Sequence, residues 1–135
     1  MYRKITIMSE NDVRIAVNFV RCMGVSLQFS PVDVQKLMVT VSELTQNIID
    51  HANSDGFIIL EMIEEDGIKI TVQDFGSGIS QLDEILQGNR NFERKGLGLG
   101  LLGARRLMDD FFIETSKEGT KIIAIKRKDT DRAKY

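Results

Sequence analysis

The residues from Ser30 to Ala52 form the longest helical pattern in the chain, and this pattern constrains the fold more than any other feature. Ser30 is a good N-cap residue, Pro31 follows it in the first turn, where a missing N–H costs nothing, and Asp33 adds an acidic group there. The residues of the predicted buried stripe then recur at steps of three and four: Val34, Leu37, Met38, Val41, Leu44, Thr45, Ile48 and Ala52. We therefore predict a long amphipathic helix with one face in the core.

The same helix carries a polar face near its C-terminal end. At about 100° per residue, Glu43, Asn47, Asp50 and His51 cluster well away from the centre of the apolar stripe. The side chains of Glu43 and Asn47, four residues apart, should point the same way at the edge of the core. Taken alone, such a face is most simply a solvated surface, so its meaning depends on the rest of the chain.

Length, charge and cysteine content exclude several classes of protein. The 135 residues fit one domain, which we expect to span 1–135 with a frayed polar tail over 128–135. The formal net charge is -2 with both signs interspersed, so neither nucleic acid nor a membrane is an expected partner. Cys22 is the single cysteine, and no segment approaches the length of a bilayer span. We expect a soluble cytosolic protein whose partner is another protein or a small ligand.

Shorter patterns place the remaining elements along the chain. We predict a strand at 3–8, a helix from about 13 that Gly24 ends, the central helix, and a hairpin of strands 57–63 and 68–72. After an irregular segment at 75–95, we expect residues 96–103 to lead into a helix that reaches about Asp110, followed by a last hairpin of strands 111–115 and 120–126. This order predicts an α/β two-layer sandwich, in which a mixed, mainly antiparallel sheet has helices on one face.

Two motif matches fail because their surroundings are wrong. Gly98 to Gly103 fits GxGxxG, but a charged segment precedes it where a dinucleotide site needs a strand. Asp74 to Gly76 spells DFG, yet no HRD loop precedes it and the chain is too short for the protein-kinase fold. The phosphate-binding motif GxxxxGK[ST] does not occur.

Four weak signals remain, and they become specific in combination. They are Glu43 with Asn47 on the central helix, Asp74 with Gly76 and Gly78 after a strand, Gly96, Gly98 and Gly100 opening a helix, and Gly119-Thr120 starting the last strand. In this order they resemble the GHKL superfamily of ATP-binding proteins, whose domain is called the Bergerat fold. SELTQNIIDHA is similar to its N box, QDFGSGI to its first glycine box and KGLGLGLLGARRLMDD to its second, so the resemblance covers nearly the whole chain.

The resemblance implies a nucleotide site for ATP and Mg²⁺. Asn47 would coordinate the Mg²⁺ that bridges the phosphates, since a carbonyl oxygen suits this hard ion. Asp74 would accept a hydrogen bond from the adenine 6-amino group, and Thr120 would support the same edge through water. Gly76 and Gly78 would let the backbone approach the base and ribose.

The second glycine box would hold the phosphates. Backbone N–H groups of Gly96, Gly98, Leu99 and Gly100 would face them at the positive end of the following helix. Arg105 on that helix either reaches the phosphates or is solvated, whereas Arg106 is expected at the surface. The segment 82–95 would be the lid over ATP.

The resemblance also implies catalysis. Glu43 would act as general base on water or on a substrate hydroxyl, and we expect His51 beside it to have a structural or supporting role. One departure from the family pattern is Ser77, which stands where many members have proline and should loosen that turn without removing a ligand.

The lack of room for a further domain favours the free-standing kinases of the superfamily. Among these, LGARRLMDDF followed by EGTKIIAIKR looks most like the RsbT-type switch kinases of stressosomes, and the sigma-binding RsbW and SpoIIAB type is the nearest alternative. This class phosphorylates serine or threonine on STAS-domain antagonist or scaffold proteins, and its partners include PP2C-type phosphatases and sigma factors. The alternative is a binding module that sequesters a sigma factor or phosphatase and uses ATP mainly as a structural ligand. An α/β adaptor without nucleotide would require four site elements to coincide by chance.

Overall fold

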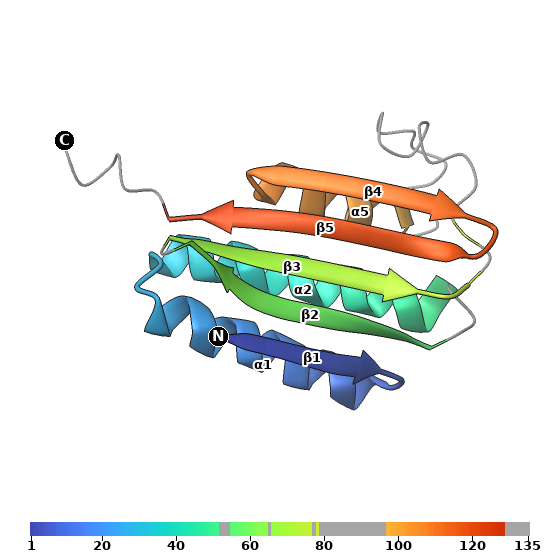
Figure 1. Ribbon diagram of the computed structural model, residues 1–135, viewed down its shortest axis with the longest axis horizontal. Coiled ribbons are helices and arrows are strands. Elements are labelled where there is room, and N and C mark those ends of the chain that lie inside the picture. Colours follow the sequence, from blue (N-terminus) through green and yellow to red (C-terminus); the bar gives the residue numbers. More distant parts are fainter. Residues whose placement is uncertain (52–54, 65, 77, 79–96, 129–135) are drawn as a thin grey trace.

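Five strands form one sheet, and the helices described here cover one of its faces (Figure 1). The computed structural model describes residues 1–51, 55–64, 66–76, 78 and 97–128. Its elements are β1 (Tyr2–Ile7), α1 (Glu10–Ser26), α2 (Pro31–His51), β2 (Gly56–Ile63), β3 (Gly67–Asp74), α5 (Leu97–Leu107), β4 (Asp110–Ser116) and β5 (Gly119–Arg127). Within these residues, no helix combines the length and the apolar character that crossing a membrane requires.

The sheet has the order β1-β2-β3-β5-β4, and every strand pair described is antiparallel. The predicted two-layer α/β sandwich is therefore confirmed, while the expectation of a mixed sheet is wrong. The reason is that β2 with β3 and β4 with β5 are hairpins, and β5 returns antiparallel beside β3. This return places Asp74, the last residue of β3, directly opposite Thr120.

The core lies between the sheet and the helices, and α2 supplies a large share of it. The side chains of Leu37, Val41, Leu44 and Ile48 are at most 2% exposed, as the apolar stripe predicted. The predicted start of α2 is confirmed as well, because the Asp33 N–H donates to Ser30 Oγ at 3.1 Å. Burial of this stripe fixes the rotation of α2 about its own axis.

Two helices end at different residues from those predicted. Helix α1 continues past Gly24 to Ser26, and a Cβ at Gly24 would lie 3.2 Å from the Val34 side chain. This glycine therefore lets α2 pack closely instead of ending α1. Helix α5 ends at Leu107, before the predicted Asp110, because the Asp109 N–H already donates to the Ile125 carbonyl at 2.9 Å and begins the pairing of β4 with β5. The tail expected at 128–135 lies outside the described residues from position 129 on.

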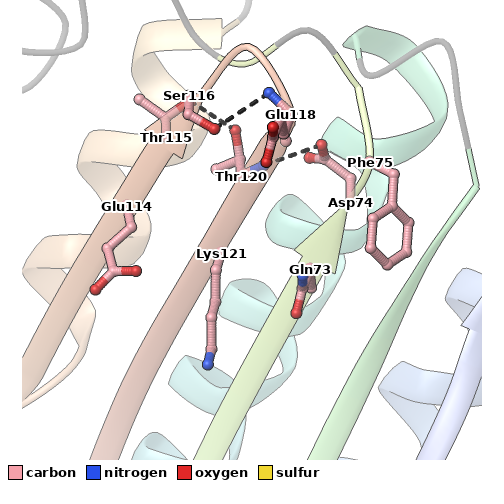
Figure 2. A pocket seen from close by; sticks show the side chains of 10 residues that line it. Gln73, Asp74, Phe75, Glu114, Thr115, Ser116, Glu118, Thr120 and Lys121 are labelled. Carbon is pink, nitrogen blue, oxygen red and sulfur yellow. Dashed lines mark hydrogen bonds between the residues drawn. The ribbon is translucent and has the colours of Figure 1, made fainter.

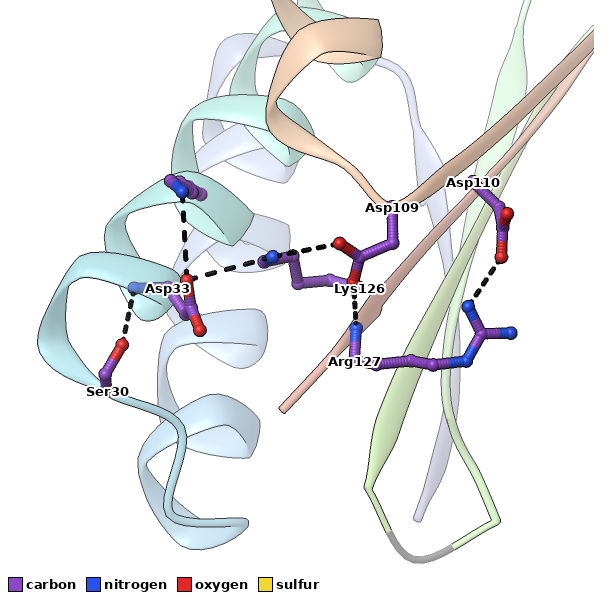
Figure 3. Close-up of polar contacts among 7 residues, drawn as sticks. Ser30, Asp33, Asp109, Asp110, Lys126 and Arg127 are labelled. Atoms are coloured by element: carbon purple, nitrogen blue, oxygen red, sulfur yellow. Dashed lines mark hydrogen bonds and ion pairs between the residues drawn. The ribbon is translucent and has the colours of Figure 1, made fainter. Parts of the chain in front are cut away.

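A charge cluster joins α2 to the sheet at the end remote from Glu43 and Asn47 (Figure 3). Lys126 on β5 is 8% exposed, and its Nζ lies 3.3 Å from Asp109 Oδ1 and 3.8 Å from the buried Asp33 Oδ1. Beside it, the Arg127 guanidinium donates to Asp110 Oδ2 at 2.6 Å, and this hydrogen bond raises the pKa of Arg127. The cluster thus links the first turn of α2, the turn after α5 and the end of β5.

Removing the Lys126 charge should destabilise the fold. In Lys126→Met the Asp33 carboxylate stays buried without its strongest neighbouring cation, and breaking a buried pair in this way costs about 3 kcal/mol of unfolding free energy. Lys36→Met is the matched control: Lys36 is about one third exposed and lies 4.0 Å from the same Asp33 oxygen, so its loss should cost less than about 1 kcal/mol. Urea denaturation measures both, and equal losses would contradict a special role of Lys126.

Candidate functional site

The four predicted site elements meet at one end of the molecule. The C-terminal turns of α2, the end of β3 and the start of β5 lie at the same end of the sandwich (Figure 1). The beginning of α5 joins them there, because Gly100 lies against Glu43 of α2. Segments that are far apart in the sequence therefore supply one site.

Glu43 and Asn47 reach the same point in space, as their four-residue spacing predicted. A Cβ placed on Gly100 would lie 2.7 Å from Glu43 Oε2 and 3.9 Å from Asn47 Oδ1. Gly100 is therefore the residue that leaves room for the Glu43 carboxylate. Glu43 is exposed and Asn47 is half-buried.

The Asn47 amide nitrogen is buried and has no hydrogen-bond partner within the described part of the chain. An unpaired buried donor costs about 1 to 3 kcal/mol, so a protein keeps one chiefly where a ligand or a bound water accepts its hydrogen bond. Since the same side chain turns its Oδ1 towards Gly100, it offers an acceptor and a donor to a ligand beside the start of α5.

The Asp74 carboxylate connects three segments. Its Oδ1 accepts hydrogen bonds from the Gly76 N–H at 3.0 Å and from the Thr120 N–H at 3.3 Å. Both of these bonds end on the same oxygen, so among the described residues Oδ2 has no donor. The carboxylate is half-buried. Asp74 is thus held by one oxygen and can accept a ligand hydrogen bond with the other.

Thr115 is a site residue that the sequence reasoning missed. Its Oγ1 lies 2.9 Å from the Oγ1 of Thr120, which is 5% exposed, and the two residues face each other across the β4–β5 hairpin. The predicted hairpin contained the signal, because its register pairs these positions, but nothing in the sequence says that the two hydroxyls meet.

Two glycines of the site are needed by the chain itself. Gly78 has a φ of 88°, and a Cβ there would collide with the Ser116 carbonyl. Gly119 has a φ of 144°, and a Cβ there would collide with the Asp74 carbonyl. Gly78 and the end of β3 therefore pack directly on the β4–β5 hairpin.

A cavity of about 430 Å³ adjoins the Asp74–Thr120 pair (Figure 2). Asp74 and Thr120 line it together with Phe75, which is 58% exposed. Gln73 and Lys121 also line it, and they project on the sheet face opposite α2. This cavity therefore borders the predicted nucleotide site from the open side of the sheet and is not the space between the sheet and α2.

The second glycine box is only partly described. Gly96, Ser77 and the predicted lid at 82–95 lie outside the described residues, as does the side chain of His51. Gly98, Leu99 and Gly100 belong to α5, which begins at Leu97, so these residues are helical and do not form a loop ahead of the helix. Their N–H groups are nevertheless among the first four of the helix, which have no partner within it. Arg105 and Arg106 are both exposed on α5.

Comparisons with known proteins agree with this arrangement. Residues 8–126 match the family described as the histidine kinase-like ATPase domain. The serine/threonine-protein kinase RsbT of Bacillus subtilis is 35% identical over 90% of this chain and 93% of its own. An anti-sigma F factor of Clostridium perfringens is 34% identical over 73% of this chain and 75% of its own. The crystal structure of the SiaB-SiaC complex from Pseudomonas aeruginosa shares the fold with a TM-score of 0.68 at 14% identity, covering 93% of this chain and 88% of that chain.

Two glycines of α5 should respond differently to alanine. Gly103 has no atom within 4 Å of an added Cβ, so Gly103→Ala should stabilise the protein by up to about 1 kcal/mol through helix propensity. Gly100→Ala gains the same helix propensity, but its Cβ forces the Glu43 carboxylate to move. This movement should cancel about half or more of the stabilisation that the helix propensity provides. Urea denaturation of the two variants measures the difference. Equal stabilisation would show that Gly100 does not confine Glu43.

Proposed function

The chain belongs to the histidine kinase-like ATPase domain family, and from this premise we propose that it is an ATP-dependent serine/threonine protein kinase of a partner-switching pathway. The similarity to RsbT over nine tenths of the chain supports the reaction. The observation that carries the proposal is the convergence of Glu43 and Asn47 on the beginning of α5. This arrangement puts a carboxylate beside N–H groups that suit phosphate.

Glu43 is the proposed general base. It would accept the proton of a serine or threonine hydroxyl while that oxygen forms a bond to the γ-phosphorus of ATP. The bond between the γ-phosphorus and the bridging oxygen breaks, and ADP leaves with the electron pair. Because Glu43 is exposed, a hydroxyl of a second protein can reach it.

Asn47 is the proposed protein ligand of Mg²⁺. Its carbonyl oxygen is a hard donor, and Mg²⁺ typically binds through one or two protein groups together with substrate phosphates. The ion would neutralise charge on the phosphates during transfer. The buried Asn47 Nδ2 fits this assignment, because phosphate oxygens would provide the acceptor that the described residues do not. The N–H groups of Gly96, Gly98, Leu99 and Gly100 would bind the same phosphates, and Arg105 could contribute charge from α5.

Asp74 is the proposed adenine ligand. Oδ2 would accept the hydrogen bond of the 6-amino group, while Oδ1 keeps its bonds to Gly76 and Thr120. Thr120 would serve the neighbouring position of the base, and Gly78 would bring the backbone close to it. A rigid acceptor at this place selects adenine over guanine, whose 6-oxygen would face the carboxylate.

We propose a STAS-domain antagonist or scaffold protein as the substrate. A PP2C-type phosphatase or a sigma factor would be a second partner, bound without phosphorylation, and the similarity to an anti-sigma F factor supports this class. The proposed setting is the cytosol.

The test is to incubate the purified protein with Mg-ATP and STAS-domain antagonists and to measure phosphate transfer to them. Tight binding of a sigma factor or phosphatase, without phosphate transfer to any antagonist, would favour the binding module instead.

Replacing the proposed base should slow transfer and spare binding. Glu43→Gln keeps the shape of the side chain beside Gly100 but cannot take the proton, so kcat should fall by roughly 10²- to 10⁴-fold. ATP affinity should change little. Glu61→Gln on β2 is the control and should transfer phosphate at the wild-type rate. Near-normal kcat in Glu43→Gln, measured with a verified substrate, would remove Glu43 from the mechanism.

Replacing the proposed adenine ligand should instead weaken binding. In Asp74→Asn the amide oxygen can still accept from Gly76 and Thr120, but the amide nitrogen then faces the adenine amine, donor against donor. The mismatch of about 1 to 3 kcal/mol corresponds to roughly 5- to 150-fold weaker ATP binding by calorimetry. Asp66→Asn at the opposite end of the β2–β3 hairpin is the control. Unchanged affinity in Asp74→Asn would contradict the assignment.

A further inference from the structure

The cavity of about 430 Å³ opens on the face of the sheet that lies opposite α2 (Figure 2). Glu114, Lys121 and Gln73 lie side by side on β4, β5 and β3 in the register of the sheet, so their side chains share this open face. Phe75, which follows the end of β3, lines another side of the cavity. The reaction proposed above makes no use of these four side chains.

The charges around this cavity favour a positively charged guest. Its described lining contains three carboxylates, those of Asp74, Glu114 and Glu118, and Lys121 is the one cation among the same residues. Glu114 and Glu118 are exposed, and neither forms an ion pair within the described part of the chain. This holds even though Lys121 lies directly opposite Glu114 in the strand register. A cation would therefore be attracted to this lining, whereas an anion would meet like charge.

Phe75 adds an aromatic side to the charged lining. Its side chain is 58% exposed, and its ring centroid lies 6.2 Å from that of Phe57, so one neighbour supports the ring while much of it stays accessible. The face of an aromatic ring attracts cations. The same sheet already contains one such contact, because Lys4 Nζ lies 4.2 Å from the centroid of Phe57. Among the described residues, no cation lies over the Phe75 ring in this way.

We propose that this cavity binds an arginine side chain of a partner protein, with the guanidinium group against the Phe75 ring and paired with the Glu114 carboxylate. A guanidinium group is planar, so it stacks on an aromatic ring and donates two parallel hydrogen bonds to one carboxylate. A lysine ammonium group does neither. Glu118 adds negative potential from the β4–β5 turn, and the volume of the cavity suits one large side chain.

The position of this site separates it from catalysis. Gln73 and Lys121 project on the open face of the sheet, whereas Glu43 lies on α2, in the helix layer. A protein that binds through the cavity contacts the sheet face opposite the proposed base. This arrangement suits the partner that is bound without phosphorylation, a role that rests on the function proposed above. Binding of the arginine itself does not depend on that function, because no residue of the cavity has to act on ATP.

The test titrates the full chain, without nucleotide, with a blocked tripeptide of alanine, arginine and alanine. Binding is followed through the backbone amide signals of Gln73, Glu114 and Lys121 in two-dimensional NMR spectra, which should shift and reach saturation. The lysine tripeptide should bind roughly 2-fold more weakly or worse, because it loses the stacking and the paired hydrogen bonds. The citrulline tripeptide has the same shape without the charge and should not saturate these signals.

Matched variants locate the contact. Phe75→Leu and Glu114→Gln should each weaken binding of the arginine tripeptide roughly 2- to 5-fold, the usual worth of an exposed cation–aromatic contact or ion pair. Phe112→Leu is the control for the ring, since Phe112 is also 58% exposed and shares the open face of β4 but does not line the cavity. Glu61→Gln on the same face of β2 controls for the lost charge. Both controls should bind as wild type does.

Several results would overturn the proposal. One is the absence of saturable shifts with the arginine tripeptide, and another is equal affinity for the lysine or citrulline tripeptide. Equal weakening in Phe75→Leu and Phe112→Leu would place the contact elsewhere. If Phe75→Leu unfolds at a lower temperature, Phe75→Tyr keeps the ring, and loss of binding in that variant would also contradict the site. A chain that binds the tripeptide but transfers no phosphate would contradict the proposed function alone, so the two failures are distinguishable.

Discussion

Burial of one stripe of α2 against the sheet is the constraint on which the rest of the structure depends. Leu37, Val41, Leu44 and Ile48 are essentially inaccessible, and a Cβ on Gly56 of β2 would lie 2.9 Å from the Ile48 side chain. Rotating the helix would expose this stripe, at roughly 1.5 to 3 kcal/mol for each large side chain. The direction of Glu43 and Asn47 is therefore set by residues that never contact a ligand.

The two ends of the sandwich are held by different kinds of interaction. At the first turn of α2, Lys126 bridges Asp33 and Asp109, so the helix, the turn after α5 and the end of β5 are tied together by charge. At the site end, the Asp74 carboxylate connects the end of β3 to the start of β5, and its donors are neutral backbone N–H groups. Neutral donors suit the proposed function of Asp74. A lysine ammonium group paired with this carboxylate would occupy Oδ2, the oxygen that is proposed to accept the hydrogen bond of the adenine 6-amino group.

Much of this arrangement could be predicted from the sequence, for identifiable reasons. The N-cap at Ser30 and the stripe of α2 are local signals, and they placed Glu43 beside Asn47 correctly. Helix ends were less predictable, because Gly24 accommodates Val34 and Asp109 pairs with Ile125, and both contacts depend on partners distant in sequence. Thr115 escaped notice for the same reason, and the antiparallel return of β5 beside β3 is likewise a property of the assembled sheet.

The site divides into a part that the fold completes and a part that it leaves open. Asp74 Oδ1, Thr120 and Thr115 are already connected by hydrogen bonds, so recognition of the base needs little rearrangement. Glu43, by contrast, is exposed, and within the part of the chain that the structure describes the only restraint identified on its carboxylate is the space left by Gly100. A general base that is exposed to water competes with water molecules for the substrate proton. A general base that is covered by a docked substrate protein does not. Nucleotide binding would then belong to this chain alone, while catalysis would require the substrate protein to close over Glu43.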